Sequence, residues 1–213
     1  MSERLKIALT KGRLQDKSLE LFEEMGLDCS PVRSPGRRLI HPLPGYPLDV
    51  VLAKAPDVIT YVEHGVCDLG VVGKDTILEK GGAFYEVLDL GFGRCRFALA
   101  VPRGSDFYGT YKTRRVASKY PEVTRAFFEK KGMDVDIVKI EGSVELAPIL
   151  GLSDGIVDIV ETGATLRENG LEPIEDVARV SARLIVNTAS MKLHKGQILD
   201  FIGRCQQALE GRN

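Results

Sequence analysis

The sequence predicts an α/β fold organised as two lobes, and three observations support this. Apolar runs of strand length alternate with helical patterns from the N-terminus onward, which is typical of βαβ units with largely parallel sheets. The alternation changes character at 91–93, where we expect the chain to cross into a second lobe. A segment rich in β-branched residues, 177–187, is expected to return it to the first. The predicted domains are residues 1–92 and 181–213 for the first lobe and 93–180 for the second.

Hydrophobic periodicity and helix-stop glycines predict the elements of the first lobe. We expect strands at 5–10, 48–53, 68–73 and 85–90, and helices at 14–26, 55–65 and 74–80. Pro56 suits the first turn of its helix. The segment 28–47 is rich in proline, glycine and arginine, so we expect an exposed loop or short hairpin there.

The same reasoning predicts the elements of the second lobe and the C-terminal helix. We expect strands at 96–101, 115–118, 135–140 and 155–160, and helices at 120–131, 144–150 and 165–170. The apolar stripe of the last helix comprises Ile198, Phe201, Ile202, Cys205 and Leu209. Tyr120, Phe127 and Phe128 lie at helical spacing, so we expect them in the core and not stacked on a nucleotide base.

Composition excludes several classes of protein. The chain has 213 residues, is 44% hydrophobic and carries a formal charge of -1, which gives no reason to expect nucleic acid or an acidic membrane as partner. No apolar run approaches the ~20 residues that span a bilayer, and the N-terminus lacks a signal-peptide pattern. We therefore expect a cytoplasmic protein. The 4 cysteines and 3 histidines are scattered, which indicates buried thiols and no zinc site, and we assign no metal ligand.

The segment 158–166 indicates a phosphate site. A buried strand ends here and is followed by two threonines, a glycine and an alanine before a short helix. Backbone N–H groups and hydroxyls of such a loop can converge on a phosphate. Asp158 and Glu161 would repel a phosphate unless they face the hydroxyls of an attached sugar, so a sugar phosphate fits. The alternative is a simple helix start capped by Thr162 or Thr165.

A longer stretch, from Glu145 to Leu166, resembles the ATP phosphoribosyltransferase family. The glutamate, the glycine, the aspartate and the Thr-Gly-x-Thr-Leu run recur there at the family's spacing. The resemblance extends to Thr10-Lys-Gly-Arg-Leu14, to 57–70 and to Val186-Asn187. The overall length is similar to the short form of the family.

The resemblance implies a type II periplasmic-binding-protein-like fold with the ligand cleft between the lobes. It also implies the reaction: N1 of ATP attacks C1 of phosphoribosyl pyrophosphate, and pyrophosphate leaves with inversion. Such a transfer passes through an oxocarbenium-like state, so positioning and electrostatics dominate catalysis. The negative charge of both substrates calls for Mg²⁺ and for several cationic side chains.

The resemblance and the pattern together assign the site residues. Catalytic roles fall to Asp158, Glu161 and Arg13. The phosphoribosyl pyrophosphate site comprises Asp158, Glu161, Thr162, Gly163, Ala164 and Thr165. The ATP polyphosphate site comprises Lys11, Gly12, Arg13, Arg37 and Lys54. Arg38 competes with Arg37 for its role, and Glu145 either contacts the sugar or simply favours a helix start.

The family also implies partners. Short forms assemble with a regulatory subunit that resembles histidyl-tRNA synthetase, in a hetero-oligomer, and self-association is expected. We therefore expect the chain alone to be insensitive to histidine. Two alternatives remain open at this stage. One is a non-catalytic ligand sensor of the same fold, and the other is a phosphoribosyltransferase of the unrelated common fold, whose two acids are adjacent and not three apart.

Overall fold

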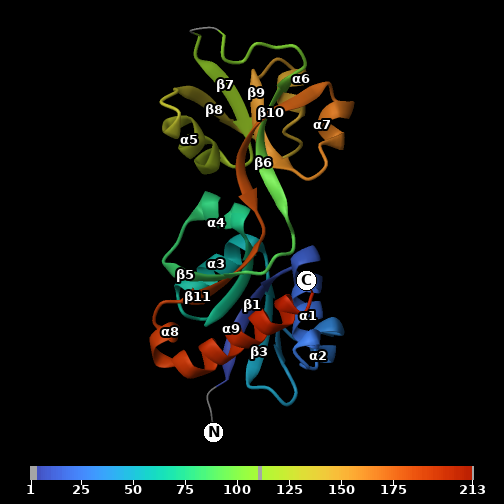
Figure 1. Cartoon of the computed structure of the whole chain (residues 1–213), viewed down its shortest axis with the longest axis vertical. Coiled ribbons are helices and arrows are strands. Elements are labelled where there is room, and N and C mark those ends of the chain that lie inside the picture. The colour runs from blue at the N-terminus through green and yellow to red at the C-terminus, as the bar shows by residue number, and fades with distance from the viewer. Residues whose placement is uncertain (1–3, 110–111, 213) are drawn as a thin grey trace. The chain divides into compact units, whose positions relative to one another are not determined.

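The computed structural model describes residues 4–109 and 112–212 and divides into two compact units (Figure 1). Unit one comprises Met1–Gly93 and Ser181–Asn213, and unit two comprises Arg94–Val180. Each unit contains one sheet covered by helices on both faces.

Unit one contains a six-stranded sheet in the order β2-β3-β1-β4-β11-β5. Its strands are β1 Leu5–Thr10, β2 Ile40–Pro42, β3 Leu48–Ala53, β4 Leu69–Gly73, β5 Phe84–Asp89 and β11 Ala182–Asn187. Its helices are α1 Arg13–Glu24, α2 Ser30–Arg33, α3 Ala55–Glu63, α4 Lys74–Lys80, α8 Ser190–Leu193 and α9 Lys195–Glu210.

Alternating side chains of the central strand β1 supply two separate cores. Ile7 belongs to a buried cluster with Phe22 of α1 and Phe201 of α9, whose rings lie 5.5 Å apart in an edge-to-face arrangement. Ala8 faces the opposite side and packs in a cluster with Val58 of α3. The sheet is therefore held between α1 and α9 on one face and α3 on the other.

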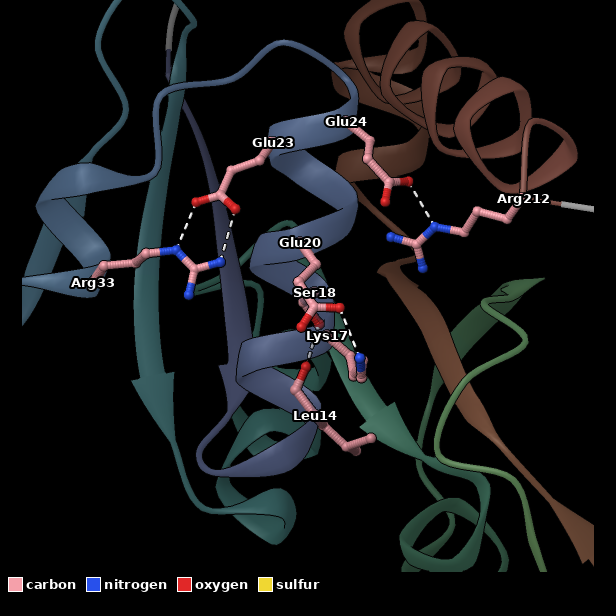
Figure 2. Close-up of polar contacts among 8 residues, drawn as sticks. All are labelled: Leu14, Lys17, Ser18, Glu20, Glu23, Glu24, Arg33 and Arg212. Atoms are coloured by element: carbon pink, nitrogen blue, oxygen red, sulfur yellow. Dashed lines mark hydrogen bonds and ion pairs between the residues drawn. The ribbon is translucent and has the colours of Figure 1, made fainter.

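Polar contacts hold α1 to its neighbours (Figure 2). Arg33 of α2 donates two hydrogen bonds to Glu23, at 2.6 and 2.7 Å. Arg212, beyond the end of α9, donates to Glu24 at 2.6 Å. Both contacts anchor the C-terminal end of α1, the helix that Arg13 opens at its other end.

Unit two contains a five-stranded sheet in the order β10-β6-β9-β7-β8. Its strands are β6 Cys95–Pro102, β7 Arg114–Ser118, β8 Val135–Lys139, β9 Gly155–Val160 and β10 Leu171–Val180, and its helices are α5 Pro121–Lys130, α6 Leu146–Ile149 and α7 Ala164–Glu168. Val116 and Val157 face the α5 side with Phe128, which is buried as expected. Ala117 and Ile156 face the other side, in a cluster that includes Ala147 of α6 and Leu166 of α7.

Three details differ from the sequence-based expectations. The sheets are mixed: of the nine strand pairings in the described residues, only β1 with β3 and β4, and β7 with β8 and β9, are parallel. The prediction of largely parallel sheets was wrong because β6, β10 and β11, which flank the crossings between units, run against their neighbours, and because β2 forms a hairpin with β3. In the segment 28–47, β2 pairs with β3 in the expected short hairpin, but the segment also forms α2 and is not exposed throughout, since Val32, His41 and Leu43 are buried. The helix expected at 144–150 shortens to Leu146–Ile149.

Candidate functional site

Strand β9 and helix α7 form one side of a pocket in unit two. The pocket has a volume of about 250 Å³ and is lined by Glu145 and by the continuous segment 158–166. The structure therefore brings together the acids Asp158 and Glu161 and the loop residues Thr162, Gly163, Ala164 and Thr165.

The loop is shaped by Gly163, which adopts a left-handed conformation with φ 71°. A Cβ added there would lie 3.2 Å from Nη1 of Arg167, and residues other than glycine rarely adopt this backbone. Gly163, and neither threonine, occupies the N-cap position of α7. The hydroxyl of Thr162 nevertheless accepts from the N–H of Ala164, the first helical residue, so the alternative of a capping Thr162 is met in part.

The hydrogen bonds at the start of α7 show which of its N–H groups have an intrahelical acceptor. The first intrahelical bond runs from the N–H of Arg167 to the carbonyl of Gly163, at 3.1 Å. The N–H groups of Thr165 and Leu166 precede it and have no intrahelical acceptor. The hydroxyl of Thr162 accepts a bond from the N–H of Ala164 at 3.3 Å. Because α7 has only 5 residues, its dipole is small, and the individual N–H groups are the relevant donors.

Asp158 is the half-buried acid of the pocket. Burial raises the pKa of this carboxyl above its ordinary value of 3.8. The N–H of Ile159 donates to Oδ1 at 2.8 Å and lowers the pKa, the nearby Glu145 raises it, and Lys119 lowers it. The pocket thus holds a carboxylate whose charged form the fold itself disfavours.

Four of the other predicted residues lie at one edge of the sheet in unit one. Strands β1 and β3 are parallel neighbours, so both end at the same edge. The N–H of Lys11 donates to the carbonyl of Ala53 at 2.9 Å, which places Lys11 beside Lys54, the N-cap of α3. Gly12 has φ 89°, and Arg13 opens α1. The side chains of Lys11, Arg13 and Lys54 are exposed at this edge.

Arg37 and Arg38 lie between α2 and β2, just before Ile40, which pairs with Val51 near the end of β3. They line a second pocket of about 310 Å³ together with Gly36, His41 and the prolines 31, 35 and 42. Both arginines are exposed and both line the pocket, so the structure does not choose between them.

Among the described residues, no group of three or more His, Cys, Asp or Glu side chains is placed to hold a metal ion. Within the same residues, no helix combines the length and the apolar character that crossing a bilayer requires. Among the described residues, the cysteines at 29, 67, 95 and 205 form no disulfide with one another.

Comparisons with known proteins concern the family of the chain. A family model described as ATP phosphoribosyltransferase matches residues 54–207. A relative of that name from Clostridium kluyveri is 57% identical over 203 residues, which cover 95% of this chain and 93% of the relative. Another, from Clostridium acetobutylicum, is 55% identical over 206 residues, which cover 97% and 96%.

Solved structures agree with the fold. The ATP phosphoribosyl transferase (HisG:HisZ) complex from Thermotoga maritima matches with a TM-score of 0.82 and 33% identity, covering 97% of this chain and 99% of that chain. The periplasmic aliphatic sulphonate binding protein SsuA from Escherichia coli matches with a TM-score of 0.64 and 13% identity, covering 98% and 73%. The second likeness concerns the fold alone, and it confirms the predicted two-lobed, periplasmic-binding-protein-like class.

Proposed function

The chain belongs to the ATP phosphoribosyltransferase family, and we propose that the pocket of β9 and α7 binds the phosphoribosyl group of its substrate. The enzyme transfers this group from phosphoribosyl pyrophosphate to N1 of ATP, which gives phosphoribosyl-ATP and pyrophosphate in the first step of histidine biosynthesis. Membership of this family excludes the two alternative functions, a non-catalytic ligand sensor and a phosphoribosyltransferase of the unrelated common fold. The observation that supports the pocket assignment is that one small cavity gathers two acids and a donor-rich loop.

In this proposal the loop holds the 5-phosphate. The N–H groups of Thr165 and Leu166 and the hydroxyls of Thr162 and Thr165 donate to its oxygens. Gly163 lets the backbone approach closely, since it carries no side chain between the N–H groups and the ligand. Each such bond to a charged group is worth about 1.5–3 kcal/mol.

Asp158 and Glu161 act on the ribose. Their carboxylates accept hydrogen bonds from the ribose hydroxyls, which orients the ring for attack at C1. They also stabilise the positive charge that develops on the ribose as pyrophosphate leaves. Because this charge exists only near the transition state, the carboxylates should contribute more to turnover than to binding.

The cations at the edge of unit one bind polyphosphate. Lys11 and Lys54 are brought together by the pairing of β1 with β3, and Arg13 follows within two residues of Lys11. Arginine can bind phosphate oxygens with two parallel hydrogen bonds, while lysine acts as a point charge. We assign this cluster, with Arg37, to the triphosphate of ATP.

Magnesium enters this proposal with the substrates. The described residues offer no cluster of metal ligands, so the chain does not fit a resident metal ion of its own. Mg²⁺ is commonly held by substrate phosphates with few protein carboxylates, and we expect the substrates to bind as their magnesium complexes.

Both substrates are metabolites of the cell interior, so we place the reaction in the cytoplasm.

The purified chain, supplied with ATP, phosphoribosyl pyrophosphate and Mg²⁺, should form phosphoribosyl-ATP. Gly163→Val should raise the KM for phosphoribosyl pyrophosphate about tenfold or more, as the loss of one charge-assisted bond predicts, and should change the KM for ATP far less. The exposed Gly132→Val, which also replaces a glycine of positive φ, is the control for backbone strain. Equal effects of Gly163→Val on both substrates would exclude the loop as the phosphate site.

We also propose that the chain works with a regulatory subunit. The Thermotoga maritima structure is a HisG:HisZ complex, and the family's short forms pair with a subunit that resembles histidyl-tRNA synthetase. Histidine should therefore inhibit the assembled complex and leave the isolated chain unaffected, because the effector site lies on the partner. Strong inhibition of the isolated chain by histidine would contradict this.

A further inference from the structure

Lys119 lies directly after strand β7, next to the acid of the phosphoribosyl pocket. In the register of the sheet, Ala117 pairs with Ile156 and Ser118 pairs with Val157. One residue further along both segments, Lys119 comes opposite Asp158. Neighbouring positions on parallel strands lie about 4.8 Å apart, well within the reach of a lysine side chain.

The two residues also share one face of the sheet. Side chains alternate between faces, so Lys119 lies on the same face as Ala117, and Asp158 lies on the same face as Ile156. Ala117 and Ile156 both belong to the buried cluster on the side of α6 and α7, which is the side of the pocket. Lys119 accordingly lowers the pKa of Asp158, an interaction that requires proximity.

The ammonium group of Lys119 is available to a ligand. Its side chain is exposed, and its charge acts on two carboxylates, since it lowers the pKa of Glu141 as well as that of Asp158. The neighbouring Lys139, which ends β8, forms a salt bridge with Glu141 at 2.9 Å. Lys119 does not line the 5-phosphate pocket itself.

The geometry of phosphoribosyl pyrophosphate indicates which of its groups lies near Lys119. In phosphoribosyl pyrophosphate the pyrophosphate on C1 and the two ring hydroxyls project from the same face of the ribose, and the 5-phosphate extends from the opposite face. If Asp158 holds the ring hydroxyls, a cation beside Asp158 and outside the phosphate loop lies near the pyrophosphate. We propose that Lys119 binds the pyrophosphate group of phosphoribosyl pyrophosphate and orients it for departure.

This inference rests on the proposed phosphoribosyl pocket. It also identifies Lys119 as a residue that the sequence reasoning missed. Lys119 touches the leaving group in this proposal, so it should affect both substrate binding and the release of pyrophosphate. An ammonium is a suitable group, since it provides a compact charge with three donors.

Binding of two probes in the presence of Mg²⁺ tests the proposal. Calorimetry would compare inorganic pyrophosphate with ribose 5-phosphate on the wild type, Lys119→Ala and Lys119→Arg. We expect Lys119→Ala to weaken pyrophosphate binding about tenfold, as the loss of one charged contact predicts, with ribose 5-phosphate changed less than twofold. Lys119→Arg should restore most of the loss. The KM for phosphoribosyl pyrophosphate should rise in parallel, while the KM for ATP stays constant.

Lys139→Ala is the matched control, because Lys139 ends the adjacent strand, pairs with Ser118 and so faces the α5 side of the sheet. It should leave both probes unchanged. Lys119→Gln provides a second variant, and thermal unfolding verifies that each variant folds. Equal weakening of both probes, weakening of ribose 5-phosphate alone, or no weakening of either would overturn the role of Lys119. A wild type that binds neither probe and forms no phosphoribosyl-ATP would instead overturn the proposed pocket.

Discussion

Replacing Asp158 with asparagine should stabilise the folded chain at neutral pH and lower its turnover. Burial raises the pKa of Asp158, so the folded state retains this proton to higher pH than the unfolded state does. The stability that this proton contributes is present below the ordinary pKa of 3.8 and is lost as pH rises through the folded-state pKa. At neutral pH the carboxylate is therefore a net cost to folding.

The size of the effect follows from the surroundings of the carboxyl. Asp158 is half-buried, so solvent screens part of its charge, and we expect a gain on the order of 1 kcal/mol for Asp158→Asn. For a chain of this length that equals about 2–4 °C in Tm. Asparagine retains an oxygen for the bond that Ile159 donates at 2.8 Å, so the variant loses no backbone partner.

Thermal unfolding at pH 8 and at pH 4, with steady-state kinetics at pH 8, measures both effects. The gain in Tm should be largest at pH 8 and should shrink toward pH 4, where the wild-type carboxyl takes up its proton. Turnover should fall on the order of 10²-fold, as the loss of an electrostatic contact to the transition state predicts, with a smaller change in KM. The exposed Asp136→Asn should change neither quantity. A variant that is less stable than the wild type at pH 8, or one that turns over normally, would refute the reasoning.

Three further predictions concern other parts of the chain. Arg13→Ala should lower kcat/KM about tenfold, and added salt should weaken ATP binding to the wild type; full activity would remove Arg13 from the site. Gly70→Ala should destabilise the fold by about 1–3 kcal/mol in urea unfolding, because its Cβ would lie 2.8 Å from side-chain carbons of Val58 and of Val62. Gly203→Ala, with no atom within 4 Å of its Cβ in α9, should instead stabilise it by about 0.5–1 kcal/mol, and a loss of stability would contradict this.

The strands and helices could be predicted from the sequence where the periodicity of apolar side chains matches the faces that are buried. The alternation of Ile7, Ala8 and Leu9 places large side chains against α1 and α9 and a small one against α3. Strand direction did not follow from the same signal. An apolar run reads the same in a parallel and an antiparallel strand, so the reversal of β6, β10 and β11 depends on pairing partners that are distant in the sequence.

The candidate site, like the fold, could be predicted from the sequence only in part. The pocket in unit two was predictable because one continuous segment, 158–166, supplies nearly all of its lining. Glu145 is the N-cap of α6, and the family motif already includes it. Lys119 follows a different strand, and its position beside Asp158 depends on the register of β7 with β9. Register is set by the packing of two faces, so this residue could be found only in the structure.

The electrostatics of Asp158 connect stability with catalysis. Burial and the nearby Glu145 disfavour its charge, whereas the Ile159 N–H and Lys119 favour it. A carboxylate that its surroundings stabilise poorly gains more from an approaching positive charge than one already neutralised by a close cation. The ribose becomes positive only as the bond to pyrophosphate breaks, so this gain falls mainly on the transition state. It follows that an additional cation near Asp158, for example from Thr162→Lys, should hold the carboxylate ionised and stabilise the fold at pH 8, yet should lower kcat.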